Sequence, residues 1–313
     1  MLIKTPNFWR TKPSILSIVL LPFAYIYKMV AGVVSMFRKP FKAPVPIICV
    51  GNHVVGGAGK TPVVQALAEY LIQNGQHPHI VSRGYGGKKT KSPHKVNPSR
   101  DKAEIVGDEP LLLAEIAPTW VCKNKRLAML AAYETGATHV ILDDGLQSNY
   151  FKDTYNILVI DPPYGFNNPL PFPAGPNRES FAAATDKSQL TVSYSDYGDD
   201  IKKNLSIQTE LGFKPCDVIG FAGIGRPDKF KQSLQFHGCN IIDFQAFPDH
   251  HLFTQNEITK LVNTAKAKKA TLVTTKKDFV RIPQSQRKYV KVMTLRVHEI
   301  EAQEKLADLL SLA

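Results

Sequence analysis

Residues 47–61 of the chain read IICVGNHVVGGAGKT. The apolar run 47–50 predicts a buried strand, and the glycine-rich residues after it lead through Gly59, Lys60 and Thr61 into a predicted helix. In a loop of this kind the backbone amides and the helix N-terminus hold phosphate, the lysine adds positive charge, and the threonine hydroxyl binds magnesium. The stretch therefore predicts a nucleoside triphosphate site on an α/β fold.

One position departs from the phosphate-loop pattern G-x-x-x-x-G-K-[ST]. The pattern has glycine where this chain has Val54. Three glycines remain before the lysine, so the loop can still turn tightly and bring its backbone close to a ligand; they are Gly56, Gly57 and Gly59. The alternative is an ordinary glycine-rich connection between a strand and a helix.

Composition sets the broad limits. A chain of 313 residues is long enough for one large or two moderate domains, and its 43% hydrophobic and 21% charged residues exclude wholesale disorder. The 39 basic and 27 acidic residues give a net charge of +12, which favours anionic partners such as nucleic acid, acidic membrane surfaces or phosphorylated substrates. The four cysteines form no C-x-x-C pair, so neither a zinc site nor a disulfide framework is indicated.

Short apolar strands alternate with helical patterns from residue 45 onward, which predicts an α/β protein with a mainly parallel sheet. The polar, basic segment 83–103 lacks apolar periodicity and is expected to be a long loop. The alternating segments 190–195 and 205–209 are candidates to bridge two halves of the chain. Strands are expected at 45–50, 79–82, 119–122, 138–143, 156–161, 217–222, 239–244, 271–275 and 289–295, and helices at 62–74, 109–116, 124–135, 228–237, 255–268 and 299–311.

Three units are expected from this pattern. Residues 1–42 form a membrane-associating N-terminal helix, residues 43–210 a phosphate-loop domain, and residues 211–313 a smaller C-terminal α/β domain. The two α/β units are expected to enclose a cleft.

The N-terminal segment is apolar and has basic flanks. Residues 14–27 carry no charge, and the apolar character resumes after Lys28 through Phe37. A spanning helix needs about 20 apolar residues and would have to include Pro22 and Lys28. The segment lacks the small-residue cleavage site that a signal peptide would have. An interfacial helix fits the basic ends better. We expect membrane association and leave open whether the helix lies on the bilayer or spans it; a helix packed on the domain is the alternative.

Acidic pairs follow two of the predicted elements. Asp143 and Asp144 come directly after the strand 138–142, at the sheet edge where a phosphate-loop enzyme holds magnesium. Asp-Asp-Gly is also a common turn sequence. Asp108 and Glu109 begin a predicted helix, where a base for a hydroxyl, a metal ligand and simple helix capping all remain open.

The run FPDHH at 247–251 follows another strand. Adjacent residues rarely converge on one metal ion, and no third distant ligand is evident. His250 is instead a candidate to orient, or share a proton with, a catalytic carboxylate. A solvated loop histidine is the alternative.

Taken together, these motifs resemble those of the lipid A 4′-kinase (tetraacyldisaccharide 4′-kinase) family over nearly the whole chain. The matching motifs, in order, are VGN…GGAGKTP at 50–62, SRGYGG at 82–87, GDEP at 107–110, KR at 125–126, LDDGLQ at 142–147, PAGPNRE at 173–179, FAGIGRP at 221–227, FPDHHLF at 247–253 and VTTKKD at 273–278. The chain departs from the family pattern at His53-Val54, Ala58, Leu146 and Lys276, and the last of these reverses a charge.

The resemblance implies a kinase that uses ATP and magnesium to phosphorylate the 4′-hydroxyl of a lipid-linked glucosamine disaccharide. It implies work at the cytoplasmic face of the bacterial inner membrane, with no nucleic-acid partner and no obligate protein partner. A membrane-bound phosphate-loop ATPase or switch without a small-molecule acceptor is the main alternative. A nucleic-acid-binding protein is another, although no aromatic-interleaved basic motif supports it.

The resemblance also implies roles for individual residues. On the nucleotide side, Lys60 would contact the β- and γ-phosphates, Thr61 would bind magnesium, and Gly56, Gly57, Ala58 and Gly59 would surround the phosphates. Asp143 or Asp144 would bind the metal, with Glu109 as a further candidate. Asp108 would activate the sugar hydroxyl and pair with His250, and Arg126 would offset charge on the transferred phosphoryl group. The residues near the disaccharide or its phosphate would be Arg83, Tyr85, Gln147 and Arg178.

Overall fold

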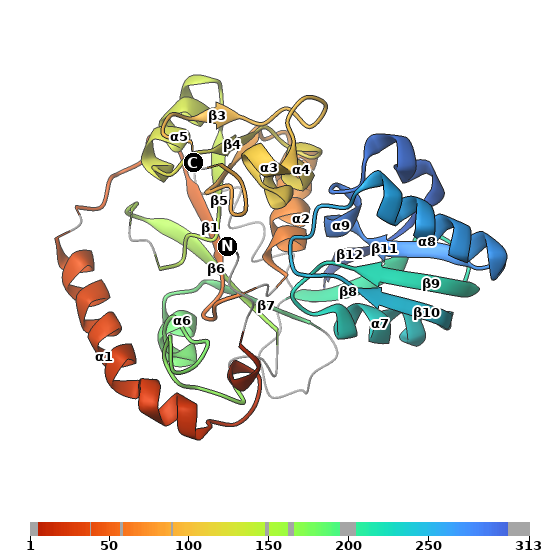
Figure 1. The fold of residues 1–313 in the computed structure, drawn as a ribbon. Coiled ribbons are helices and arrows are strands. Elements are labelled where there is room, and N and C mark those ends of the chain that lie inside the picture. The colour runs from red at the N-terminus through yellow and green to blue at the C-terminus, as the bar shows by residue number, and fades with distance from the viewer. Residues whose placement is uncertain are drawn as a thin grey trace.

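A computed structural model describes residues 6–37, 39–56, 59–88, 90–147, 150–161, 166–194 and 205–299. Its strands form one 12-stranded sheet in the order β10-β9-β11-β12-β8-β7-β6-β1-β5-β2-β4-β3. Among the described strands the pairs β12–β8 and β3–β4 are antiparallel, and the other neighbouring pairs are parallel. Figure 1 shows helices on both faces. The predicted α/β class with a mainly parallel sheet is confirmed.

The elements lie close to their expected positions. The strands are β1 (Ile47–Gly51), β2 (Pro78–Ser82), β3 (His94–Lys95), β4 (Thr119–Val121), β5 (His139–Asp143), β6 (Thr154–Ile160), β7 (Leu190–Tyr194), β8 (Leu205–Leu211), β9 (Asp217–Ala222), β10 (Asn240–Ala246), β11 (Thr271–Thr275) and β12 (Lys291–Glu299). The helices are η1 (Asn7–Trp9), α1 (Ile15–Met36), α2 (Lys60–Gln73), α3 (Ala103–Val106), α4 (Asp108–Ala114), α5 (Lys125–Glu134), α6 (Phe181–Asp186), α7 (Pro227–Phe236), α8 (Gln255–Ala267), α9 (Lys276–Phe279) and η2 (Gln284–Tyr289).

Strand β1 is central, and every one of its residues is buried. Alternate side chains point to opposite faces, so Ile48 and Val50 join the apolar cluster that packs on α2, while Ile47 and Cys49 join the cluster on α5. A side chain at Gly51 would lie 2.4 Å from Cβ of Leu146. Glycine at the end of β1 therefore lets the segment after β5 pack directly against the start of the nucleotide loop.

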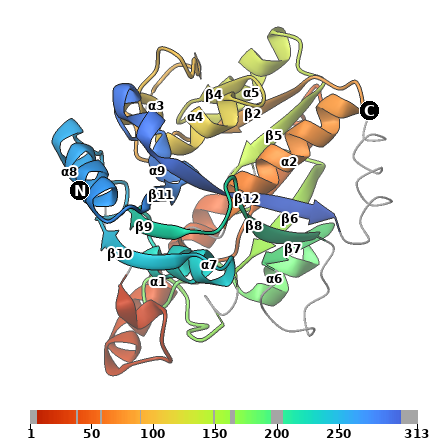
Figure 2. The same cartoon turned by 90° about the vertical axis from the view of Figure 1, so that its right-hand side faces the viewer.

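Strands β7 and β8 join the two halves of the sheet, as expected for the alternating segments at 190–195 and 205–209. Strand β8 pairs with β7 on one side and with β12 on the other, and Figure 2 shows β8 and β12 at this junction. The second half, with α7, α8 and α9, forms the smaller part of Figure 1. The sheet is continuous through residue 210, and the expected domain boundaries stay predictions.

The local structure differs from the expectations in two respects, and a third expectation falls outside the described residues. The segment 83–103 is not wholly a loop, because His94 and Lys95 form β3 against β4 at the sheet edge and α3 begins at Ala103. The short helices α6 and α9 escaped prediction because neither is long enough to show helical periodicity. The helix expected at 299–311 lies outside the described residues, apart from Glu299, which ends β12.

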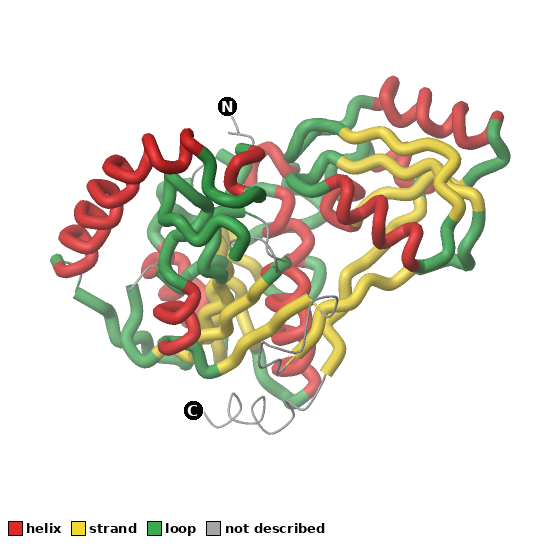
Figure 3. The backbone as a smooth tube through the Cα atoms, turned by 90° about the horizontal axis from the view of Figure 1, so that it is seen from below, coloured by secondary structure: helices red, strands yellow, loops and turns green. Residues whose placement is uncertain are grey.

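Helix α1 contains both Pro22 and Lys28 in one run of 22 residues. Among the described residues it is the one helix long and apolar enough to cross a membrane, a test that a signal sequence near the N-terminus also passes. It lies along the outside of the protein in Figures 1 and 3, and 11% of its most apolar window is buried. Most of α1 is therefore not packed on the domain, and the alternative of a helix packed on the domain is wrong for most of the length of α1.

Candidate functional site

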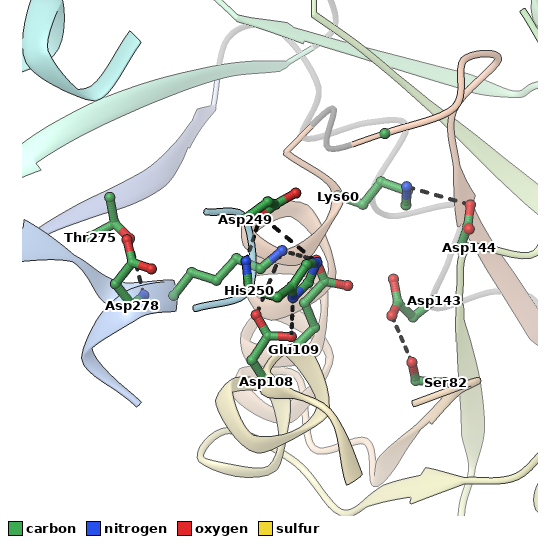
Figure 4. A network of polar contacts seen from close by, with 12 residues as sticks. Lys60, Ser82, Asp108, Glu109, Asp143, Asp144, Asp249, His250, Thr275 and Asp278 are labelled. Carbon is green, nitrogen blue, oxygen red and sulfur yellow. Dashed lines mark hydrogen bonds and ion pairs between the residues drawn. The ribbon is translucent and has the colours of Figure 1, made fainter. Parts of the chain in front are cut away.

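The candidate site lies where β1, β2 and β5 end beside the starts of α2 and α4 (Figure 4). Because these strands are parallel neighbours, their carboxyl ends meet at one sheet edge. Two groups of polar side chains occupy this edge. The Lys60 group comprises Asn52, Lys60, Ser82, Asp143, Asp144, Gln147 and Arg178, and the Asp108 group comprises Asp108, Glu109, His250, Lys277 and Arg281.

Lys60 opens α2 and points back toward the end of β5. Its Nζ donates to Oδ1 of Asn52 at 3.2 Å and lies 3.5 Å from Oδ1 of Asp144. Arg178 Nη1 donates to the same oxygen of Asp144 at 2.8 Å and to Oε1 of Gln147 at 3.3 Å. Burial alone would raise the pKa of Asp144, but the two cations beside it hold that pKa below its usual range. Asp144 is therefore a carboxylate between two positive charges.

Asp143 is buried more deeply than its neighbour. Its Oδ2 accepts a hydrogen bond of 2.9 Å from the hydroxyl of Ser82 at the end of β2, while its Oδ1 is buried without a hydrogen-bond partner. Burial raises the pKa of Asp143 to about 6, and the nearby carboxylate of Glu109 adds to the rise. An unpaired buried oxygen beside a second carboxylate is a place that a cation would stabilise.

Lys125 contacts the backbone of the acidic pair Asp143–Asp144. This side chain is fully buried, and its Nζ donates to the backbone oxygens of Asp143 at 2.6 Å and Asp144 at 2.8 Å. Asp144 itself has a positive φ of 56°, an unusual conformation for a residue with a side chain. Burial lowers the pKa of Lys125. The ammonium group thus holds the turn that presents both aspartates.

The structure explains why the nucleotide loop has Val54 where the phosphate-loop pattern has glycine. Val54 is 2% exposed and packs in one apolar cluster with Trp9 and Phe172. The indole nitrogen of Trp9 donates to the oxygen of Pro173 at 3.0 Å. Position 54 therefore anchors the loop to the N-terminal segment, which ties the loop to the base of α1.

Further along the loop, Gly56 has φ 120° and Gly59 has φ 74°, so both use conformations that favour glycine. Gly57 and Ala58 lie outside the described residues. Thr61 is the second residue of α2, directly after Lys60. His53, which also departs from the family pattern, is buried against the rings of Phe166 and Phe181, and burial lowers its pKa to about 4.

The Asp108 group begins at α4, whose N-cap is Gly107. Gly107 has φ 89°, and a side chain there would lie 2.6 Å from the oxygen of Tyr85, so the 82–87 segment passes directly over the helix start. Asp108 Oδ1 lies 3.4 Å from Nδ1 of His250, and Glu109 Oε1 accepts from Lys277 Nζ at 2.9 Å. The expected pairing of Asp108 with His250, 142 positions along the chain, is present in the structure.

Asp108 is held in its charged form. Burial would raise its pKa, but its surroundings hold the pKa of Asp108 well below the usual range; the groups responsible are Lys277, His250 and Arg281. Lys277 Nζ is 3.7 Å from Oδ2 of Asp108, and Arg281 Nη2 donates to the same oxygen. Conversely, burial would lower the pKa of Lys277, whereas the two carboxylates beside it raise that pKa.

Of the other predicted residues, Arg83, Tyr85 and Arg126 lie outside the two groups, and Gln147 belongs to the Lys60 group. Arg83 and Tyr85 are exposed after β2, and the Tyr85 ring lies 5.7 Å from that of His250. Gln147 Nε2 donates to the oxygen of Asn52 at 2.7 Å. The guanidinium of Arg126 lies over Phe41, 3.9 Å from the ring centroid, so its role at the transferred phosphoryl group stays a prediction.

Several residues of the site escaped the sequence analysis. Ser82, Lys125 and Lys277 all stand inside quoted motifs, and the first two lie directly beside Arg83 and Arg126, which were assigned roles. The charge reversal at Lys276 lies outside the site, because its Nζ pairs with the exposed Glu115 at 3.3 Å. The other members that escaped notice are Asn52, Glu179, which accepts from Gln147 at 2.7 Å, and Arg281.

Among the described residues, no group of three or more histidine, cysteine or acidic side chains is arranged to hold a metal ion. Magnesium does not require such a cage, because it retains waters and is commonly held by one or two carboxylates and the phosphates of a substrate. The unpaired Oδ1 of Asp143 and the nearby carboxylates of Asp144 and Glu109 fit that ion.

Comparison with known proteins gives consistent matches over the whole chain. The family model described as tetraacyldisaccharide-1-P 4′-kinase matches residues 16–312. Proteins named tetraacyldisaccharide 4′-kinase are 38% identical in Parvibaculum lavamentivorans, over 89% of this chain and 86% of that protein, and 37% identical in Gluconobacter oxydans, over 98% of both chains. The crystal structure of LpxK from Aquifex aeolicus in complex with ATP has a TM-score of 0.77 and 26% identity, covering 95% of this chain and 99% of that one.

Proposed function

Since the chain belongs to the tetraacyldisaccharide-1-P 4′-kinase family, we propose that its Lys60 group binds the nucleotide and its Asp108 group activates the acceptor. The chain is a phosphotransferase of lipid A biosynthesis that phosphorylates the 4′-hydroxyl of tetraacyldisaccharide 1-phosphate with ATP. A phosphate-loop ATPase without a small-molecule acceptor is not favoured, because the relatives are named as 4′-kinases.

One observation carries the division of roles. A buried carboxylate paired with a histidine, Asp108 with His250, lies at the same sheet edge as the lysine of the phosphate loop. The two groups also act on one another, because Glu109 contributes to the raised pKa of Asp143. Phosphoryl transfer needs an acceptor oxygen and a γ-phosphate held in line, with positive charge near the equatorial oxygens.

In the proposed reaction the acceptor hydroxyl gives its proton to Oδ1 of Asp108 as its oxygen attacks the γ-phosphorus of ATP. The bond between that phosphorus and the β–γ bridging oxygen breaks, and ADP leaves. Lys60 stabilises the charge that spreads over the phosphate oxygens in the transition state. Asn52, which accepts from Lys60, holds the ammonium group toward that position.

Magnesium would be held by Asp143, Asp144 and the hydroxyl of Thr61, with Glu109 close enough to contribute. When bound, the ion neutralises charge on the β- and γ-phosphates. Arg178 places a positive charge beside the acidic pair, because its Nη1 lies 2.8 Å from Oδ1 of Asp144. We assign the exposed Arg83 and Tyr85, together with Gln147, to the disaccharide side of the site.

The substrate is a lipid, so the enzyme works at a membrane. We propose the cytoplasmic face of the bacterial inner membrane, where ATP is available, with α1 as the docking element. The helix exposes large apolar side chains along its length, for example Ile18 at 61% and Phe23 at 61%, and its flanks are basic. Such a helix binds anionic bilayers through apolar burial and charge together.

This placement predicts the behaviour of α1 on vesicles. Replacing Ile18 and Phe23 together by serine should move a large share of the protein from the pellet to the supernatant when it is sedimented with anionic vesicles. Phe236→Ser is the control, because Phe236 is 82% exposed on α7 in the other half of the chain. Equal sedimentation of all three proteins would remove α1 from the docking surface.

The activity itself is tested with purified protein, ATP, magnesium and the detergent-dispersed disaccharide lipid. We expect a product phosphorylated at the 4′-position and ADP release that depends on the acceptor. Chelation with EDTA should abolish turnover, and added magnesium should restore it. ADP release at the same rate with and without the lipid would instead support the ATPase alternative.

A further inference from the structure

Arg281 connects four separate parts of the chain at the Asp108 group. Its side chain is 1% exposed. Nη1 donates to the oxygen of Gly223 at 2.8 Å and to Oδ1 of Asp278 at 3.0 Å, while Nη2 donates to Oδ2 of Asp108. Nη2 also lies 3.1 Å from Nδ1 of His250. A guanidinium at this depth is stable only when its donors are paired, so its position is closely determined.

The contacts divide the two oxygens of Asp108 between different neighbours. Oδ2 accepts from Arg281 and lies 3.7 Å from the ammonium of Lys277. Oδ1 faces only the imidazole among these partners, at 3.4 Å from Nδ1 of His250. A carboxylate held on one oxygen by fixed cations keeps the other oxygen in one orientation, with lone pairs left to receive a proton.

The same arginine orients the histidine. Nη2 of Arg281 lies 3.1 Å from Nδ1 of His250, the ring nitrogen that faces Oδ1 of Asp108 at 3.4 Å. His250 is further fixed through its backbone, because its amide donates at 2.9 Å to the Gly223 oxygen that also accepts from Arg281. Both members of the Asp108–His250 pair therefore depend on one side chain.

The alternative is that Arg281 only stabilises the fold of the smaller half. Asp278 and Arg281 form an ion pair three residues apart at the end of α9, and Thr275 Oγ1 donates to Asp278 Oδ2 at 2.9 Å. This part of the network uses Nη1 alone. Nη2 is directed to Asp108 and His250, and neither residue belongs to α9.

We propose that Arg281 is a positioning residue for the phosphoryl transfer, which holds Oδ2 of Asp108 so that Oδ1 is presented to the acceptor hydroxyl. The proposal rests on the assignment of Asp108 as the base. Within the described part of the chain the hydrogen-bond partners of Arg281 do not include Lys60 or the acidic pair 143–144, so its effect belongs to the chemical step and not to nucleotide binding.

The first test is the steady-state kinetics of Arg281→Met with ATP and the disaccharide lipid varied in turn. We expect kcat to fall by about 10- to 100-fold, which is part of the effect of a positioned base, while KM for ATP changes by less than about two-fold. Lys276→Met is the matched control, since it removes a cation of the same segment whose partner is the exposed Glu115. A kcat within about three-fold of wild type would overturn the proposal.

A double-mutant cycle separates positioning from folding. If Arg281 acts through Asp108, Arg281→Met should lower kcat by less than about three-fold further in an Asp108→Asn background, because the interaction is already lost. Multiplying effects would overturn the proposal. If Asp108→Asn alone leaves kcat unchanged, the base assignment fails, whatever Arg281→Met does.

A second pair of variants covers loss of folding. Asp278→Asn removes the structural partner of Arg281 and leaves its Nη2 contacts in place, so positioning predicts a much smaller fall in kcat than for Arg281→Met. If Arg281→Met does not fold, Arg281→Met with Asp278→Asn removes the buried pair together and restores neutrality, and its kcat is measured instead. Equal losses in Asp278→Asn and the folded Arg281 variant would show a structural role.

Discussion

Replacing Lys60 by alanine should lower kcat/KM for ATP by about 10²- to 10³-fold, the typical effect of losing one preorganised charge at a developing anion. The side chain is 11% exposed and already held by Asn52 and Asp144, so little reorganisation is needed when phosphate arrives. Initial rates of 4′-phosphate formation over a range of ATP concentrations measure the change.

The control for Lys60 is Lys268→Ala, which removes an exposed lysine that pairs with Asp243 at 3.3 Å on the smaller half. Exposed ion pairs of this kind contribute little, and its rate should match that of the unchanged enzyme. Thermal unfolding verifies that both variants fold. If Lys60→Ala formed product as fast as its control, the phosphate-loop assignment would have to be abandoned.

Replacing Asp108 by asparagine should lower kcat by about 10²-fold or more, because the amide keeps the shape of the side chain and cannot take up the acceptor proton. KM for ATP should change little, since Asp108 contacts the smaller half of the chain and not Lys60. Rapid-quench measurement of a single turnover distinguishes a slow chemical step from slow release of ADP.

Glu115→Gln is the control at the other end of the same helix, where Glu115 forms the C-cap of α4 and pairs with Lys276 on the surface. Its kcat should be unchanged. A near-normal kcat for Asp108→Asn would reassign Asp108 to helix capping or to a role in holding Arg281, and the general base would have to be sought elsewhere in the group.

Much of the fold could be predicted because its signals are local. The all-apolar run at β1 and the glycines after it predicted a buried strand that leads into a phosphate loop, and the alternating segments at β7 and β8 were candidates for the bridge that the structure shows. Pro22 and Lys28 made the length of α1 uncertain, because the sequence alone does not show whether a helix tolerates them.

The site could be predicted only in part. Motifs pointed to Lys60, Asp108, Asp143 and His250, and the structure brings them to one edge of the sheet. In two motifs, however, nothing in the sequence singled out one member of an adjacent basic pair. Arg126 was assigned a role while Lys125 lies buried under the acidic pair, and Lys276 was questioned while its neighbour Lys277 contacts Asp108 and Glu109.

The sequence by itself determined that this chain has an α/β fold with a phosphate-loop nucleotide site, since strand, loop and helix follow one another within fifteen residues and their chemistry is local. The resemblance of its ordered motifs to a known family then implied a kinase. Only the tertiary structure decided which cation faces which carboxylate. Arg281 reaches Asp108 across 173 positions, and the direction of each side chain depends on how α4 packs against α9. Adjacent residues on a helix or turn point in different directions, so a one-residue difference in sequence separates a buried partner from a solvated surface charge.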